Sequence, residues 1–208
     1  LTLGTSAFTT DGLVNGDTVT DVTLASDGAA ATATVGSYDV TPSTAIGSGL
    51  TNYAISYVTG TLSVGTKALT ITADARSKTY GATLTLGTTA FTTDGLVNGD
   101  TVTDVTLTSA GAADTATVGS YDVTPSVAIG SGLTNYAISY VTGTLTVGAK
   151  ALTITADARS KTYGATLTLG TSAFTTDGLV NGDTVTDVTL ASDGAAATAT
   201  VGSYDVTP

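Results

Sequence analysis

The sequence predicts an all-β protein made of tandem small β-sandwich domains, immunoglobulin-like in type and arranged as an extended string. Three observations lead to this fold class. They are an internal repeat of 83 residues, short segments in which apolar and polar residues alternate, and the lack of any segment with a 3.6-residue apolar period. The frequent Thr, Val and Tyr residues suit pleated, half-buried surfaces. A β-grasp-like repeat is the alternative fold.

The repeat divides the chain into three parts. The segment 67–74 recurs 83 residues later as 150–157, and residues 1–42 are identical to residues 167–208. We therefore expect a first repeat (1–66) without the opening strand region, a complete middle repeat (67–149), and a third repeat (150–208) without the closing hairpin. A period of 83 residues exceeds the roughly 20–50 residues of solenoid repeats and suits an independent small domain.

The first strands of the middle repeat follow from its apolar pattern. Leu69, Ile71 and Ala73 alternate with Thr, and this period of two predicts a half-buried opening strand. Thr101–Thr108 is a further predicted strand, but its apolar pattern changes phase. A β-bulge near Asp104 would bring the apolar residues back to one face.

The closing strands are marked by Tyr, Pro and Gly. A strand through Tyr121 and Val123 is predicted to stop at Pro125, which cannot donate a ladder hydrogen bond. Residues 136–140 and 144–147 both alternate, and the Thr-Gly pair between them predicts a hairpin. The spacing Gly-x-Tyr-x-Val at 119–123 has the form of the tyrosine corner of immunoglobulin-like domains.

Composition excludes several classes of function. The net charge is −11, and the six basic residues fall in two short copies of one stretch, so no basic stripe exists for nucleic acid. The absence of Cys excludes disulfides and thiolate zinc sites. No segment is long and apolar enough to cross a membrane, so we expect no membrane insertion.

The sequence contains few side chains that could act in catalysis. The chain has no His, Cys or Glu, which removes most general bases. Ser77 and Lys78 form the remaining pair, but neighbouring residues of a strand point to opposite faces. We therefore predict no enzyme activity, no catalytic residues and no cofactor.

A calcium site is the strongest candidate for ligand binding in this sequence. Asp94, Asn98, Asp100 and Asp104 offer hard oxygen ligands within eleven residues, and the first repeat carries the same pattern. Asp and Asn beside Gly also form turns without any metal. The spacing is not that of an EF-hand, so we favour turns and assign no metal ligand.

Two further possibilities concern Lys78 and the tyrosines. An isopeptide bond between Lys78 and Asn135 would need a buried acid, and we expect Lys78 to be a solvated charge at a strand edge. Tyr80, Tyr136 and Tyr140 could stack on sugars. Their period of two in strands favours packing in the core or at a corner.

The ordered motifs resemble those of MBG-type repeats of the Tyr-Gly variety. They are Lys-Thr-Tyr-Gly at 78–81, Gly-Leu-Val-Asn-Gly-Asp at 95–100, Val-Gly-Ser-Tyr at 118–121, and Asn-Tyr-Ala-Ile-Ser-Tyr at 135–140. Such repeats occur in large bacterial surface adhesins, including proteins similar to filamentous haemagglutinin. The resemblance covers the whole chain and implies no catalytic residue. One departure is that no Pro follows the Tyr-Gly pair.

These observations predict structural stalk repeats of a bacterial cell-surface or secreted adhesin, located outside the cell. The expected partners are neighbouring repeats of the same chain, with no nucleic acid. In the alternative hypothesis, the repeats themselves bind a host glycan or protein with avidity or mediate self-association. We also expect residues 1–66 and 150–208 to be less stable than residues 67–149.

Overall fold

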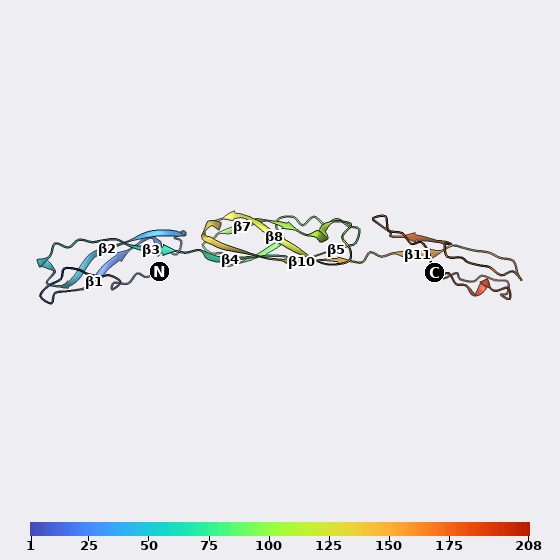
Figure 1. The fold of residues 1–208 in the computed structure, drawn as a ribbon, viewed down its shortest axis with the longest axis horizontal. Helices are drawn as coiled ribbons and strands as arrows, with labels where there is room; N and C mark the ends of the chain where they lie inside the picture. The colour runs from blue at the N-terminus through green and yellow to red at the C-terminus, as the bar shows by residue number, and fades with distance from the viewer. The chain divides into compact units, whose positions relative to one another are not determined.

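The computed structural model describes all residues from 1 to 208, and its regular elements are β-strands and single 3-10 turns (Figure 1). No helix is long and apolar enough to cross a membrane. The first repeat contains β1 (Thr18–Ala25), η1 (Asp27–Ala29), β2 (Gly36–Ser48), η2 (Leu50–Asn52) and β3 (Gly60–Val64). The middle repeat contains β4 (Lys67–Ala73), β5 (Arg76–Thr79), β6 (Phe91–Asp94), β7 (Thr101–Thr108), η3 (Ala110–Ala112), β8 (Gly119–Ser131), η4 (Leu133–Asn135), β9 (Tyr136–Val141) and β10 (Gly143–Gly148). The third repeat contains β11 (Thr153–Ala156), β12 (Phe174–Asp177) and η5 (Asp193–Ala195).

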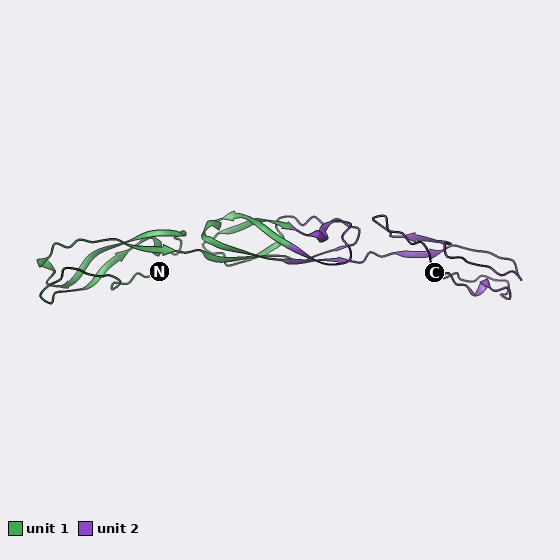
Figure 2. Ribbon diagram, viewed as in Figure 1, with its two compact units in different colours: residues 1–73, 87–107, 124–142 green, residues 74–86, 108–123, 143–208 purple.

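Two compact units divide these elements, and Figure 2 shows each in its own colour. Unit 1 consists of residues 1–73, 87–107 and 124–142, and unit 2 of residues 74–86, 108–123 and 143–208. The boundary runs through the middle repeat. The long strand β8 therefore contributes to both units, with residues up to 123 in unit 2 and the rest in unit 1.

Unit 1 contains two three-stranded sheets. In the first repeat, β2 pairs antiparallel with both β1 and β3. In the middle repeat, β4 lies between β6 and β9. It pairs antiparallel with β6 and parallel with β9, in a register from Lys67 opposite Tyr136 to Thr72 opposite Val141. The opening strand is therefore held on both sides by segments that follow it in the sequence.

The core of unit 1 forms where this second sheet faces β7. Leu69 and Ile71 from β4 and Val105 from β7 are fully buried, and Tyr136 from β9 is 7% exposed. Burial of each large aliphatic side chain stabilises the fold by about 1.5–3 kcal/mol. The predicted alternation along β4 is confirmed. The surrounding side chains that pack against this core are Phe91, Leu96, Val102, Leu107, Ala128, Leu133 and Ile138.

Unit 2 has a smaller core around β10. This strand pairs parallel with β5 and antiparallel with the first half of β8. Its side chains Leu145 and Val147 are buried together with Val123 of β8. Gly111 of η3 lies against Tyr121, and a Cβ atom at that position would come within 2.7 Å of the ring. The fold is all-β, as predicted. In a β-grasp fold the sheet packs around an α-helix, and this structure contains no α-helix.

The predicted bulge is found at the equivalent place in the first repeat. Between β1 and β2 the register shifts between Val19 and Asp21, so Thr20 is the extra residue, and Asp21 is the counterpart of Asp104. A bulge changes which face the following residues occupy. In the middle repeat, Val102 and Leu107 accordingly both pack against the core around Val105.

The predicted hairpin at Thr142-Gly143 is wrong. β9 and β10 do not pair with each other, because β9 joins β4 in one sheet and β10 joins β5 and β8 in another. A two-residue hairpin needs a positive φ in its turn, and Gly143 is not among the residues with positive φ. The chain therefore changes sheets at this point instead of reversing.

The predicted end of a strand at Pro125 is also wrong, because β8 continues to Ser131. The equivalent strand β2 explains how the proline is accommodated. Its residues up to Val40 pair with β3, and its residues from Thr41 onward pair with β1. Pro42, the counterpart of Pro125, therefore lies next to the point where β2 changes partner. The missing backbone N–H of a proline disturbs the hydrogen bonds between strands least at such a point.

Candidate functional site

A tyrosine network ties the loop before β7 to the start of β9. The Tyr136 hydroxyl donates to Asp100 Oδ2 at 2.9 Å and accepts the backbone N–H of Val97 at 2.9 Å. Burial raises the pKa of Tyr136, the hydrogen bond with Val97 lowers it, and the Asp100 carboxylate raises it, with a net increase. Tyr53 makes the same bonds with Asp17 and Val14 in the first repeat. The network is structural, because its bonds connect the start of β9 to the backbone and carboxylate of the loop before β7.

The candidate calcium ligands do not converge on one point. Asp100 is occupied by Tyr136, Asp104 Oδ1 accepts the Thr88 hydroxyl at 2.8 Å, and Asn98 donates its side-chain amide to a backbone carbonyl. Asp94 lies in β6 with an exposed side chain. No group of three or more His, Cys, Asp or Glu residues could hold a metal ion. The carboxylates therefore act as hydrogen-bond acceptors at turns and bulges.

The tyrosine corner is present in all three repeats. The Tyr121 hydroxyl donates to the carbonyl oxygen of Thr117 at 2.9 Å, four residues upstream. Tyr38 and Tyr204 make the equivalent bonds at 2.8 and 3.1 Å. This back-bonding is the feature that the sequence spacing predicted.

Lys78 is not simply a solvated charge. Its amine donates to the carbonyl oxygen of Ala82 at 2.8 Å and also to that of Ala113, which links the loop after β5 to the loop after η3. Lys78 lies in the edge strand β5, as expected, but its amine bonds to two backbone carbonyls in addition to facing solvent. Asn135 uses its Oδ1 atom to accept the N–H of Val35 at 3.0 Å. Each side chain of the imagined isopeptide pair thus has another partner.

The remaining polar candidates are likewise used by the fold. The Lys78 amine bonds to carbonyl oxygens and not to Ser77, so these two side chains do not form a pair poised for nucleophilic attack. Tyr136 packs in the core as predicted. Tyr140 is 39% exposed, and its hydroxyl accepts the N–H of Ala128 at 2.9 Å. Tyr80 is half-buried at the end of β5.

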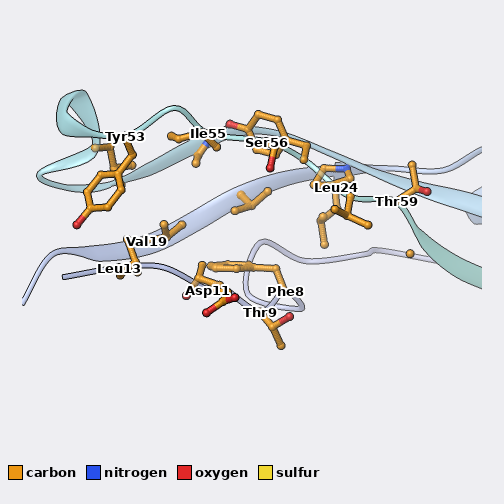
Figure 3. A pocket seen from close by; sticks show the side chains of 18 of the residues that line it. Phe8, Thr9, Asp11, Leu13, Val19, Leu24, Tyr53, Ile55, Ser56 and Thr59 are labelled. Atoms are coloured by element: carbon orange, nitrogen blue, oxygen red, sulfur yellow. Dashed lines mark hydrogen bonds between the residues drawn. The ribbon is translucent and has the colours of Figure 1, made fainter.

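A cavity in the first repeat has a volume of about 610 Å³. Figure 3 shows Phe8, Val19 and Ile55 around it. These residues are the counterparts of Phe91, Val102 and Ile138, which in the middle repeat pack against β4. The cavity is therefore a groove lined by the counterparts of side chains that pack around Leu69 and Ile71 of β4 in the middle repeat.

The edges of this groove are backbone without strand partners. Residues 53–58, which correspond to β9, form no strand in the first repeat, and Val58 is 83% exposed. Residues 8–11, which correspond to β6, are also outside any strand. Unpaired N–H and C=O groups beside an apolar groove are what an added strand recognises. Sequence reasoning did not locate this groove.

A family model matches the chain three times. The model for the MBG domain, YGX type, matches residues 3–63, 69–146 and 152–208. The chain belongs to the MBG domain family. No curated protein and no solved structure matches it. MBG repeats are not an enzyme family, and they are typical of surface proteins. A tandem array of MBG repeats fits a repeat-containing surface protein.

Proposed function

We propose that these MBG repeats form part of the stalk of a bacterial cell-surface or secreted adhesin, located outside the cell. In this role the repeats hold a binding region away from the surface. The observation that carries the proposal is the threefold recurrence of one domain with very short connections. β10 ends at Gly148, and the segment equivalent to β4 begins at Lys150. Such short joints restrict the rotation of neighbouring domains.

The side-chain chemistry supports a structural role. The carboxylates of Asp100 and Asp104 and the amine of Lys78 are used to connect loops and strands. Each of these groups bonds to another part of the same repeat. The net charge of −11 keeps a long array soluble and opposes association between copies.

Small-angle X-ray scattering on proteins with one, two and three complete 83-residue repeats tests the stalk. The maximum dimension is expected to grow in proportion to the number of repeats. A maximum dimension that stays nearly constant would rule out a spacer. Because nearly identical repeats can misfold with one another, circular dichroism and sedimentation velocity should first establish that each protein is folded and monomeric.

A binding role for the repeats is the second candidate. It is favoured by exposed apolar side chains on β8, where Val127 and Ile129 point away from the core, and by the half-exposed Tyr140 on β9. Exposed aromatic and aliphatic groups can contact a host glycan, a host protein or another copy of the chain. A glycan array and cell-binding assays, with Tyr140→Ser and Ile129→Ser as variants, test this role. Sedimentation at high protein concentration tests self-association.

A further inference from the structure

Consecutive repeats are joined by side-chain hydrogen bonds as well as by the chain itself. Within unit 1, the Asn98 side-chain amide donates to the carbonyl oxygen of Ala31 in the first repeat, at 3.1 Å. The N–H of Val35 donates in return to Asn135 Oδ1 of the middle repeat, at 3.0 Å. Two asparagines of one repeat thus contact the backbone of the preceding repeat.

The same contact recurs within unit 2, between the middle and third repeats. Asn181, the counterpart of Asn98, donates to the carbonyl oxygen of Asp114 at 3.0 Å, and Asp114 is the counterpart of Ala31. The side chain of Val180 lies beside Gly81 of the middle repeat. A Cβ atom at Gly81 would come within 2.6 Å of Val180 Cγ2. Two separate joints therefore use one pair of equivalent positions.

The face that receives the asparagine is formed within one repeat. The Lys78 amine links the carbonyls of Ala82 and Ala113, and the N–H of Gly81 donates to the Asp114 carbonyl at 3.2 Å. In the third repeat, Lys161 makes the same pair of bonds, to Ala165 and Ala196, although no atom lies within 4 Å of a Cβ atom at Gly164, the counterpart of Gly81. The receiving face is therefore preorganised, which lowers the entropy lost when the next repeat docks.

The turn that carries each of these asparagines has the same backbone conformation in all three repeats. Asn98 and Asn181 adopt the left-handed conformation with φ of 57° and 55°, and Asn15 in the first repeat has the same φ of 57°. The neighbouring Val becomes less exposed where a receiving face is present. Val14 is 58% exposed and Val97 42%, whereas Val180 beside Gly81 is only partly exposed.

From these contacts we propose that the Tyr-Gly turn of each repeat, together with its 113–114 loop, is a docking face for the Val-Asn-Gly turn of the next repeat in the same chain. Gly81 is needed there because its φ is +83° and because Val180 occupies the space of a side chain. The Asn181 side-chain amide then donates to the carbonyl of Asp114, which also accepts the N–H of Gly81. The glycine of the Tyr-Gly pair thus serves the joint between domains. This inference holds whether the array is a stalk or a binding surface.

Gly81→Ala and Gly164→Ala form a matched pair that tests the docking face. The two glycines have nearly equal φ, +83° and +85°, so both variants carry the same local strain, but nothing lies within 4 Å of a Cβ atom at Gly164. The chain has no Cys, so spin labels can be attached at Ser120→Cys and Thr175→Cys, which are exposed sites on the two sides of the second joint. Double electron–electron resonance then measures the distribution of distances across this joint.

Gly81→Ala should at least double the width of that distribution, and Gly164→Ala should leave it unchanged. Equal widths in the two variants would overturn the proposal. If Gly81→Ala proves unfolded by circular dichroism, Asn181→Gly replaces it, because Gly tolerates the left-handed turn and removes only the side-chain amide. Asn15→Gly is its control. A distance distribution that is as narrow in Asn181→Gly as in Asn15→Gly would equally refute the docking face.

Discussion

The Tyr136 hydroxyl lies 2.9 Å from Asp100 Oδ2, and this hydrogen bond joins residues 36 positions apart. It connects the first residue of β9 to the residue that precedes β7. Tyr53 and Asp17 form the same bond at 2.8 Å in the first repeat. The ring of Tyr136 is also buried, because it packs in the core that includes β4. The bond is thus common to the first and middle repeats, and in the middle repeat it anchors a residue of the core.

Replacing Tyr136 with Phe should destabilise the middle repeat by about 1–3 kcal/mol, because the Val97 N–H and the Asp100 carboxylate lose their partner. Tyr163→Phe is the control, since Tyr163 is 72% exposed. Urea unfolding followed by circular dichroism measures both variants. Equal stability of the two variants would show that the network contributes little.

Stability should fall when the pH rises above about 10, which is the ordinary pKa of tyrosine. Burial, with the Asp100 carboxylate, raises the pKa of Tyr136 in the folded chain despite the opposing hydrogen bond from Val97. The unfolded chain therefore loses its proton first, and the stabilisation is lost as the pH rises through the folded pKa. Urea titrations between about pH 9 and pH 11 should show a steeper loss in the native chain than in Tyr136→Phe. Parallel slopes would contradict this assignment.

Leu69→Ala and Leu152→Ala should differ sharply although the two residues are equivalent in the repeat. Leu69 is fully buried, so its truncation should cost about 2–5 kcal/mol. Leu152 is 42% exposed, and its truncation should cost about 0.5 kcal/mol. Differential scanning calorimetry of the whole chain separates the transitions of the repeats. A larger loss for Leu152→Ala would mean that the third repeat has another core.

A peptide with the sequence of residues 67–76 should bind the groove of the first repeat. In the middle repeat, β4 pairs parallel with β9 and antiparallel with β6 and buries Leu69 and Ile71. NMR titration should shift the amide signals of residues 8–11 and 53–58. A peptide with Asp at the positions of Leu69 and Ile71 is the control. Equal shifts with both peptides would exclude specific strand addition.

Calcium should not change the melting temperature of the chain. The carboxylates of Asp100 and Asp104 accept hydrogen bonds from Tyr136 and Thr88, and they do not gather around one point. A cation that binds the folded state raises stability in proportion to the logarithm of its concentration. Melting curves in millimolar calcium and in chelator test this expectation. A shift of several degrees that Asp100→Asn abolishes would establish a calcium site.

Several local features could be predicted from the sequence because they depend on residues close together in the chain. The alternation at Leu69 and Ile71 predicted a strand, and the spacing around Tyr121 predicted its bond to Thr117. The phase change near Asp104 predicted the bulge that is seen at its counterpart in the first repeat. Side-chain direction in a strand follows from sequence position alone, so such inferences need no knowledge of distant segments.

The sequence by itself determined the 83-residue period, the all-β character and the membership of one repeated family. The tertiary structure alone decided which strands pair, that β9 and β10 enter different sheets, and that β8 continues past Pro125. It also decided that Lys78 and Asn98 bind backbone carbonyls. The physical reason is that ladder and carbonyl hydrogen bonds join backbone groups that every residue type carries. The sequence pattern therefore places a strand, whereas only the folded chain selects its partner.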